Sequence, residues 1–174
     1  MDVVQLTRIP AVVRRFKTVK QRIVKQLKTF KEIQPQVLND ADGEVGYQLR
    51  FCPATGALAK KISDALTAEG VPAATRGGKG APDWHIYHHM FPVTGKRGAT
   101  EANCPFDCPL YLERGGQISY KRGDCPVADD LFDRVVNISL NQWYTAADCR
   151  RIAGGINKVL SAFCTEDPDA GSWT

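Results

Sequence analysis

The feature that most constrains the fold is an apolar stripe near the N-terminus. Ile9, Phe16, Ile23 and Phe30 repeat every seven residues, and further apolar residues fall between them. This spacing places the side chains on one face of an α-helix and leaves the other faces to cations. The sequence therefore predicts one long amphipathic helix over residues 10–33. Because a single helix cannot bury its stripe against itself, we expect it to lie against a folded body or another chain.

The same segment carries a charge that the rest of the chain lacks. Nine Lys or Arg residues and no acid lie between Arg8 and Lys31, whereas the other fourteen cations face all nineteen acids. A basic arm can contact nucleic acid, a membrane surface or an acidic protein, or it can be a solvated helix face. No apolar run approaches the roughly 18 residues of a membrane span, and the N-terminus does not read as a secretory signal. We expect a soluble, cytoplasmic protein without a membrane contact.

The remaining periodicity predicts a small α+β domain over residues 36–164, preceded by the long basic helix within residues 1–35. Its expected elements are a strand at 45–52, a helix at 54–69, a strand at 71–75, a helix at 127–134, a strand at 135–140 and a helix at 145–163. The last helix is the best marked, because Thr145 and Asp148 have the spacing of an N-terminal cap. Residues 77–116 are expected to be a long irregular loop, which in a compact domain is usually functional. The acidic segment 165–174 is expected to be frayed.

The one dense cluster of reactive side chains lies in that loop, at residues 83–89. All three histidines of the chain, His85, His88 and His89, are found there beside Tyr87. Imidazoles at this density can bind a metal ion or exchange protons near neutral pH. In a loop they can equally form the wall of a binding pocket. The cluster alone does not name a reaction.

Cysteines do not supply a better site. Without a secretory signal, the even count of six cysteines does not predict disulfides. Cys104 and Cys108 could join the histidines in a zinc site, but zinc sites favour two close pairs and the second pair is missing. We expect reduced cysteines and no stoichiometric metal. Because no phosphate-binding loop or nucleophile motif is present either, the residues by themselves predict no catalytic group.

Three sequence blocks resemble a known protein family. Residues 4–9 (VQLTRI) lead into the basic helix, residues 123–128 (GDCPVA) are similar to a G-x-C-P-x-A-E block, and residues 139–148 run from SL to TAAD. Together they resemble the C-terminal part of the DegT/DnrJ/EryC1/StrS sugar aminotransferases, over nearly the whole chain. The resemblance implies the small C-terminal domain of a fold-type I enzyme that depends on pyridoxal phosphate (PLP) and is usually a dimer.

The resemblance also implies an activity and a missing part. The family transfers an amino group from glutamate or glutamine to a keto-sugar or related ketone. Its Schiff-base lysine and phosphate loop belong to a large N-terminal domain that has no counterpart here, and no lysine of this chain follows the family's S-x-x-K pattern. We therefore expect a chain that is incomplete on its own, binds no PLP alone, and needs a lysine-bearing N-terminal half or partner subunit.

The resemblance assigns six substrate-side residues, four in the histidine loop and two arginines that could meet an anionic co-substrate: His85, Tyr87, His88, His89, Arg50 and Arg76. The loop departs from the family's usual H-Y-x-x-P-L-H region, and the insert CPFDCP at 104–109 is typical of one subgroup. The substrate therefore stays open. The alternative is a non-catalytic binding module whose basic helix contacts nucleic acid or an acidic protein partner.

Overall fold

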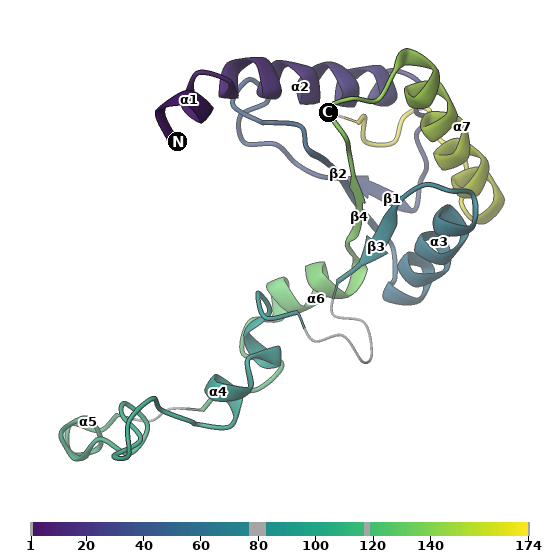
Figure 1. Cartoon of the computed structure of the whole chain (residues 1–174). Helices are drawn as coiled ribbons and strands as arrows, with labels where there is room; N and C mark the ends of the chain where they lie inside the picture. Colours follow the sequence, from purple (N-terminus) through teal and green to yellow (C-terminus); the bar gives the residue numbers. More distant parts are fainter. Residues whose placement is uncertain (1, 77–82, 117–118, 174) are drawn as a thin grey trace. The chain divides into compact units, whose positions relative to one another are not determined.

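The computed structural model describes residues 2–76, 83–116 and 119–173, which form two compact units (Figure 1). Unit 1 contains residues 1–75 and 134–174, and unit 2 contains residues 76–133. The N-terminal helix belongs to the same unit as the sheet, so it is a part of the folded body. Each unit is described by itself below.

Unit 1 is built on a four-stranded antiparallel sheet in the order β1-β2-β4-β3. Its strands are β1 (Ile33–Pro35), β2 (Gln48–Pro53), β3 (Ala73–Thr75) and β4 (Val136–Ser139). In the central pair, Leu49 stands opposite Ile138 and Phe51 opposite Val136, and all four side chains are buried. Alternate residues of a strand point to the same face, so these four form the core face of the sheet.

Three helices complete the core of unit 1: α2 (Ile9–Val24), α3 (Gly56–Ala68) and α7 (Ala146–Phe163), with the short α1 (Asp2–Leu6) before them. Helices α2 and α3 each pack against α7, and α3 also packs against the sheet. The predicted cap of the last helix is confirmed, because the Thr145 hydroxyl and the Asp148 carboxylate exchange hydrogen bonds with each other's backbone N–H. No helix in the described ranges has the length and apolar character that crossing a membrane requires.

The N-terminal helix ends well before residue 33, where the apolar stripe places its end. Phe30 lies instead in an isolated bridge, and Ile33 lies in β1. The cause is Asn157 of α7, whose side chain donates to the carbonyl oxygen of Gln26 at 2.7 Å and accepts from the N–H of Lys28 at 2.9 Å. These bonds replace the next helical turn, so the chain changes direction while the stripe residues stay in the core.

The strand expected over residues 45–52 also begins later, as β2. Gly46 has a φ of +82°, a left-handed conformation that interrupts a strand. A Cβ at this glycine would lie 3.3 Å from the main chain of Lys17, so the close approach to α2 also requires glycine. Val45 and Tyr47, which the alternation places on the core face, are exposed as a result.

The segment after α7, expected to be frayed, packs against unit 1. Trp173 is only 9% exposed and lies edge-on to Phe51, with ring centroids 5.4 Å apart. Its indole N–H donates to the carbonyl oxygen of Lys28 at 2.8 Å, and the N–H of Asp167 donates to the carbonyl oxygen of Thr29 at 3.0 Å. One buried aromatic side chain therefore anchors a segment whose composition is mostly small and acidic.

Unit 2 consists of short helical turns. They are the 3-10 helix η1 (Tyr87–His89) and the helices α4 (Phe91–Thr94), α5 (Pro109–Glu113) and α6 (Pro126–Arg134). The loop expected at 77–116 thus contains ordered turns, and residues 77–82 of that loop lie outside the described ranges. Among the described residues of this unit, Ile86 is the buried apolar side chain and Asp129 the buried acid. Polar contacts therefore take a large part in holding unit 2 together.

The other expected elements are confirmed. Helices α3, α6 and α7 and strands β3 and β4 fall where the sequence pattern predicts them, within one or two residues. The chain is an α+β protein with a small antiparallel sheet and covering helices.

Candidate functional site

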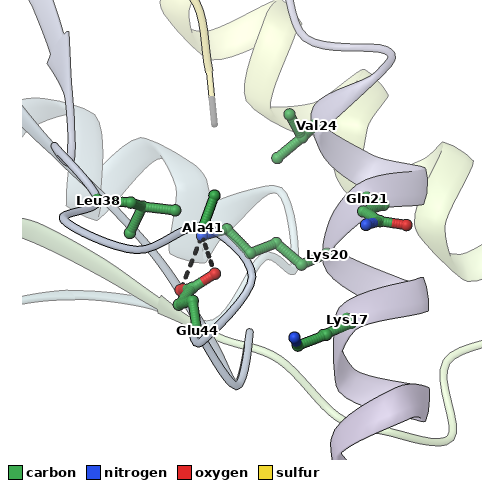
Figure 2. Close-up of a pocket in the computed structure, with 7 residues that line it drawn as sticks. All are labelled: Lys17, Lys20, Gln21, Val24, Leu38, Ala41 and Glu44. Atoms are coloured by element: carbon green, nitrogen blue, oxygen red, sulfur yellow. Dashed lines mark hydrogen bonds and ion pairs between the residues drawn. The ribbon is translucent and has the colours of Figure 1, made fainter.

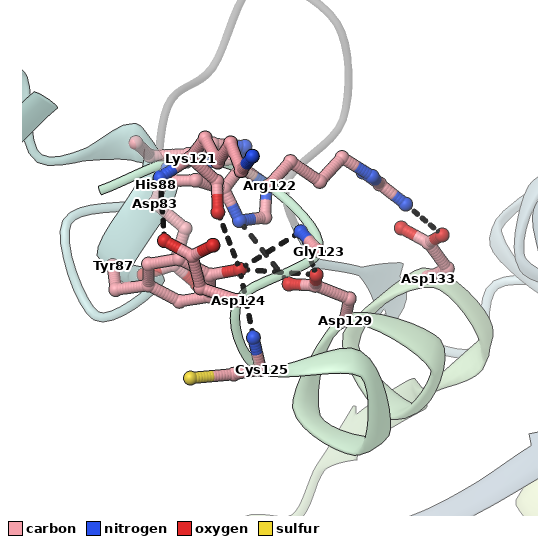
Figure 3. A network of polar contacts seen from close by, with 11 residues as sticks. Asp83, Tyr87, His88, Lys121, Arg122, Gly123, Asp124, Cys125, Asp129 and Asp133 are labelled. Atoms are coloured by element: carbon pink, nitrogen blue, oxygen red, sulfur yellow. Dashed lines mark hydrogen bonds and ion pairs between the residues drawn. The ribbon is translucent and has the colours of Figure 1, made fainter. Parts of the chain in front are cut away.

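The histidine loop and the turn before α6 meet in one polar network (Figure 3). Asp129 of α6 lies at its centre, and its Oδ2 accepts from the N–H of Gly123 at 2.8 Å and from the Tyr87 hydroxyl at 3.0 Å. The Tyr87 oxygen in turn accepts from the N–H groups of Gly123 and Cys125 at 3.2 and 3.3 Å. Gly123 has a φ of +103°, which turns its N–H toward both oxygens at a position that favours glycine.

His88 faces the other oxygen of the same carboxylate. Its Nδ1 lies 3.4 Å from Asp129 Oδ1, and the side chains of the two residues are only 12% and 8% exposed. Both atoms are buried, and neither has another hydrogen-bond partner in the described part of the chain. The His88 ring also lies edge-on to the rings of Tyr87 and His89, with centroids 5.1 and 4.5 Å away.

A second carboxylate, Asp83, organises the start of the loop. Its Oδ2 accepts from Arg76 Nε at 2.6 Å, while its Oδ1 accepts from the N–H of His85 and lies 2.8 Å from His85 Nδ1. Its own N–H donates to His89 Nδ1 at 3.1 Å. The Arg76 guanidinium, which also lies over the Phe132 ring at 5.3 Å, holds the pKa of Asp83 far below its ordinary value, with help from the N–H of His85.

The electrostatics of the network keep Asp129 ionised and Tyr87 protonated. Burial by itself raises the pKa of Asp129, but the N–H of Gly123, the Tyr87 hydroxyl and the nearby His88 and Arg122 together hold it below its ordinary value. Burial raises the pKa of Tyr87, and the neighbouring carboxylate raises it further. Near neutral pH, Asp129 is therefore an acceptor only, and the Tyr87 hydroxyl is available to donate to it.

Five of the six predicted substrate-side residues lie in this network or next to it. They are Arg76, His85, Tyr87, His88 and His89, all in unit 2. The sixth, Arg50, lies on β2 in unit 1, where its Nε donates to the side-chain oxygen of Asn137 at 2.9 Å. Their role in binding a substrate stays a prediction.

Two acids of the network, Asp83 and Asp129, were not among the predicted site residues. Asp83 directly precedes the histidines, but its carboxylate could not be assigned a partner without knowing where Arg76 lies. Asp129 had a clearer signal, because it occupies the acidic position of the G-x-C-P-x-A-E block that begins at Gly123. The block carries the family resemblance, but nothing in the sequence connects its acid to the histidines.

The structure provides no metal site in the ranges that it describes. No group of three or more His, Cys, Asp or Glu side chains is placed there to hold an ion. Cys104 and Cys108 form no disulfide, and neither do the other cysteines, all of which the structure describes. The zinc alternative therefore has no support from the geometry of the described residues.

The described lysines do not fit the attachment of a PLP-type cofactor. Such a lysine must be partly removed from water and free to react. Lys20 is the buried lysine of the described ranges, 5% exposed, but its Nζ bonds both carboxylate oxygens of Glu44 at 2.8 Å (Figure 2). The pair borders a cavity of about 120 Å³ with Val24, Leu38 and Ala41. An ammonium group held by a carboxylate is not a nucleophile, so no cofactor chemistry follows from this pair.

The cations of the N-terminal segment are partly engaged within unit 1. Besides the buried Lys20, Lys28 pairs with Glu166 at 2.6 Å, and the Arg15 guanidinium lies 4.2 Å from the ring centre of Trp143. The other cations that are exposed to solvent include Arg8, Arg14, Arg22, Lys25 and Lys31. Internal pairing therefore reduces the positive charge of this surface, but the exposed cations keep it basic.

Comparison with protein-family models finds no match to this sequence, and comparison with curated proteins finds none either. Solved structures do match. The aminotransferase TlmJ from Streptoalloteichus hindustanus covers 92% of this chain with a TM-score of 0.60 and 17% identity. Spr1654 from Streptococcus pneumoniae, assigned as a sugar aminotransferase, covers 92% with a TM-score of 0.58 and 14% identity. The synthase of 3-amino-5-hydroxybenzoic acid covers 91% with a TM-score of 0.54 and 15% identity.

The chain has an aminotransferase-like fold. It spans only about a third of the matched proteins, between 34% and 36% of their chains. The small α+β architecture expected from the sequence is thus that of one part of these larger proteins.

Proposed function

We propose that this chain is the C-terminal portion of a PLP-dependent aminotransferase of the DegT/DnrJ/EryC1/StrS type, incomplete on its own. The observation that carries the proposal is the uneven structural match. Sugar aminotransferase structures cover about nine-tenths of this chain, whereas the chain covers about a third of theirs. The sequence blocks at residues 4–9, 123–128 and 139–148 point independently to the same family and to its C-terminal part.

The missing part would be a lysine-bearing N-terminal half or partner subunit that holds the cofactor. Spr1654 has been solved in PLP and PMP forms, so at least one protein of this fold uses that cofactor. When bound there, PLP would supply the chemistry for transfer of an amino group from glutamate or glutamine to a keto-sugar or related ketone. The assembly is expected to be a dimer, as is usual for the family.

This chain would contribute the substrate side of the site. Imidazole groups of the histidine loop can hydrogen-bond the hydroxyls of a sugar, and His85 is well suited because its side chain is 83% exposed. Arg50 is half-buried, and its guanidinium has more donors than its bonds to Asn137 and Gln48 use. It would offer the remaining N–H groups to the carboxylate of the amino donor.

Reduction with borohydride tests whether this chain can hold the cofactor by itself. The full chain would be mixed with equimolar PLP, reduced, and digested for mass spectrometry. Because the described lysines include no buried, unpaired amine, we expect only low labelling spread over several surface lysines. Stoichiometric labelling of one lysine would contradict the proposal, since the chain would then carry its own cofactor lysine.

A second candidate function rests on the exposed cations around α2. A non-catalytic module could use them to bind nucleic acid or an acidic protein, and phosphate contacts would make the affinity fall steeply with salt. The aminotransferase proposal predicts no retardation of DNA or RNA in a native gel at about 50 mM salt. Retardation that is abolished by Arg14→Glu with Arg22→Glu, and kept in the control Lys60→Glu, which reverses an exposed cation on α3, would favour the binding module.

A further inference from the structure

The buried contact between His88 and Asp129 determines which ring nitrogen of neutral His88 carries the proton. We propose that Asp129 is a positioning residue that fixes the proton of His88 on Nδ1, so that the Nε2 of His88 is presented as a hydrogen-bond acceptor. The argument rests on the contacts of the two residues, and only its use in binding a substrate rests on the proposed function.

The first step concerns the pair of facing atoms. His88 Nδ1 and Asp129 Oδ1 lie 3.4 Å apart, and both are buried without another partner in the described ranges. A buried polar atom without a partner is costly. If Nδ1 carried no proton, its lone pair would face a carboxylate lone pair, and both atoms would stay unsatisfied. A proton on Nδ1 removes the repulsion between the two lone pairs and directs a polar N–H toward the carboxylate, an electrostatic contact at 3.4 Å that is longer than an ordinary hydrogen bond.

The second step is that the carboxylate cannot turn away. Its other oxygen is held by the N–H of Gly123 and the Tyr87 hydroxyl, at 2.8 and 3.0 Å. The N–H of Gly123 requires an acceptor at Oδ2, and the Tyr87 hydroxyl, whose one proton can also go to the carbonyl oxygen of Lys121 at 3.1 Å, lies on the same side of the carboxylate. The lowered pKa of Asp129, which follows from the N–H of Gly123, the Tyr87 hydroxyl and the nearby His88 and Arg122, agrees with an ionised carboxylate. Oδ1 is therefore aimed at His88 by contacts on the opposite side of the carboxylate (Figure 3).

The third step is that the neighbouring histidine has the opposite arrangement. His89 Nδ1 accepts from the N–H of Asp83 at 3.1 Å, so its proton lies on Nε2 when the ring is neutral. The two rings are in edge-to-face contact, with centroids 4.5 Å apart. Adjacent residues of one turn thus present different groups: an Nε2 acceptor from His88 and an Nε2–H donor from His89. Such a pair suits a ligand with one hydroxyl that donates and one oxygen that accepts.

Nuclear magnetic resonance reads these protons directly. Two-bond correlations between the ring carbon protons and ¹⁵N distinguish the two tautomers in the full chain at about pH 8, above the ordinary histidine pKa of about 6.5. We expect Nδ1–H at His88 and Nε2–H at His89 in the unmodified protein. His88 with its proton mainly on Nε2 would overturn the proposal without any variant.

Asp129→Asn gives the sharpest variant. The N–H of Gly123 donates to Oδ2 at 2.8 Å, so the asparagine oxygen takes that side and its NH₂ group faces His88. Nδ1 must then accept, and we expect the proton of His88 to move to Nε2, reversing the tautomer ratio by at least about tenfold. An unchanged ratio in the folded variant would contradict the positioning role.

One control separates this role from general support of the fold. Asp133→Asn removes a carboxylate from the same helix, where Asp133 pairs with Arg122, and should leave the His88 tautomer unchanged. Reversal in this control would show that Asp129 is not the controlling group. The readout is independent of PLP, so stoichiometric cofactor labelling of this chain would refute the proposed function and leave the positioning role standing.

Discussion

Removing the Trp173 side chain tests whether the C-terminal segment is a structural part of unit 1. In Trp173→Ala, the segment would lose the edge-on contact with Phe51 and the hydrogen bond to the carbonyl oxygen of Lys28. That carbonyl lies in the stretch that leads from α2 to β1, so the contact also ties the C-terminal segment to this connection. We expect a large loss of stability from a substitution two residues from the end of the chain.

The size of the loss follows from the burial of the ring. A tryptophan side chain buries roughly 150–250 Å², and Trp173 is 9% exposed. At about 25 cal/mol per Å², the burial contributes roughly 4–6 kcal/mol. Residual compactness of the unfolded chain reduces such figures by about 10–40%. We therefore expect the free energy of unfolding to fall by about 2–5 kcal/mol, which overlaps the usual range of about 3–5 kcal/mol for such truncations.

Urea unfolding followed by far-ultraviolet circular dichroism measures this change. Trp143→Ala is the matched control, because Trp143 is 64% exposed and contacts mainly the Arg15 guanidinium. An exposed cation–π contact is worth about 0.5–1 kcal/mol, so the control should lose no more than that. If Trp173→Ala lost no more than Trp143→Ala, the segment would not be packed as described.

Three further outcomes are expected. Gly154→Ala should raise the free energy of unfolding by about 0.5–1 kcal/mol, because a Cβ there meets open space. Gly155→Ala should raise it less, because a Cβ there lies 3.1 Å from a methyl group of Val71. Equal urea midpoints of the two variants would argue against the packing of α7. In an NMR titration, the carboxyl carbon of Asp83 should change below the ordinary midpoint of about 3.9, because the Arg76 guanidinium lowers the pKa of this carboxylate. The ion pair then stabilises the fold fully above about pH 3.9, and this stabilisation is lost as the pH falls through the pKa of the folded state. Arg76→Gln should raise the midpoint, and a midpoint near the ordinary value of about 3.9 in the unmodified protein would refute the ion pair. Burial raises the pKa of Cys164 to about 11, so its thiol should be alkylated more slowly at about pH 8 than the exposed cysteines. Mass spectrometry of the alkylated protein measures these rates, and equal rates would contradict the burial of Cys164.

The elements that could be predicted are those whose pattern and local signals agree. In α7, apolar residues at helical spacing follow a capping pair, and both signals concern neighbouring residues. The end of α2 could not be predicted, because Asn157 of another helix terminates it. The apolar stripe continues past that end, since Phe30 and Ile33 fill the same core from a bridge and a strand. The spacing of apolar residues predicts which side chains are buried, but it does not by itself predict whether they lie in a helix, a strand or a bridge.

The candidate site, too, has residues that the sequence could predict and contacts that it could not. The histidines and Tyr87 stand close together in the sequence, so their density could be recognised directly. Asp129 lies forty-one positions after His88, and only the fold brings its carboxylate to the ring. The tautomers of His88 and His89 follow from such partners, so they could not be predicted from the loop sequence alone.

The central claim is that this chain completes an aminotransferase whose cofactor lysine lies on another polypeptide segment. The most direct test measures transfer of ¹⁵N from labelled glutamate to a keto-sugar. The tagged chain is assayed alone and in complex with a polypeptide that co-purifies with it. This polypeptide is identified as the cofactor-bearing one when borohydride traps PLP on one of its lysines. We predict transfer by the complex and none by this chain alone or by the lysine-bearing polypeptide alone. Full activity of the lysine-bearing polypeptide without this chain, or activity of this chain by itself, would contradict the account.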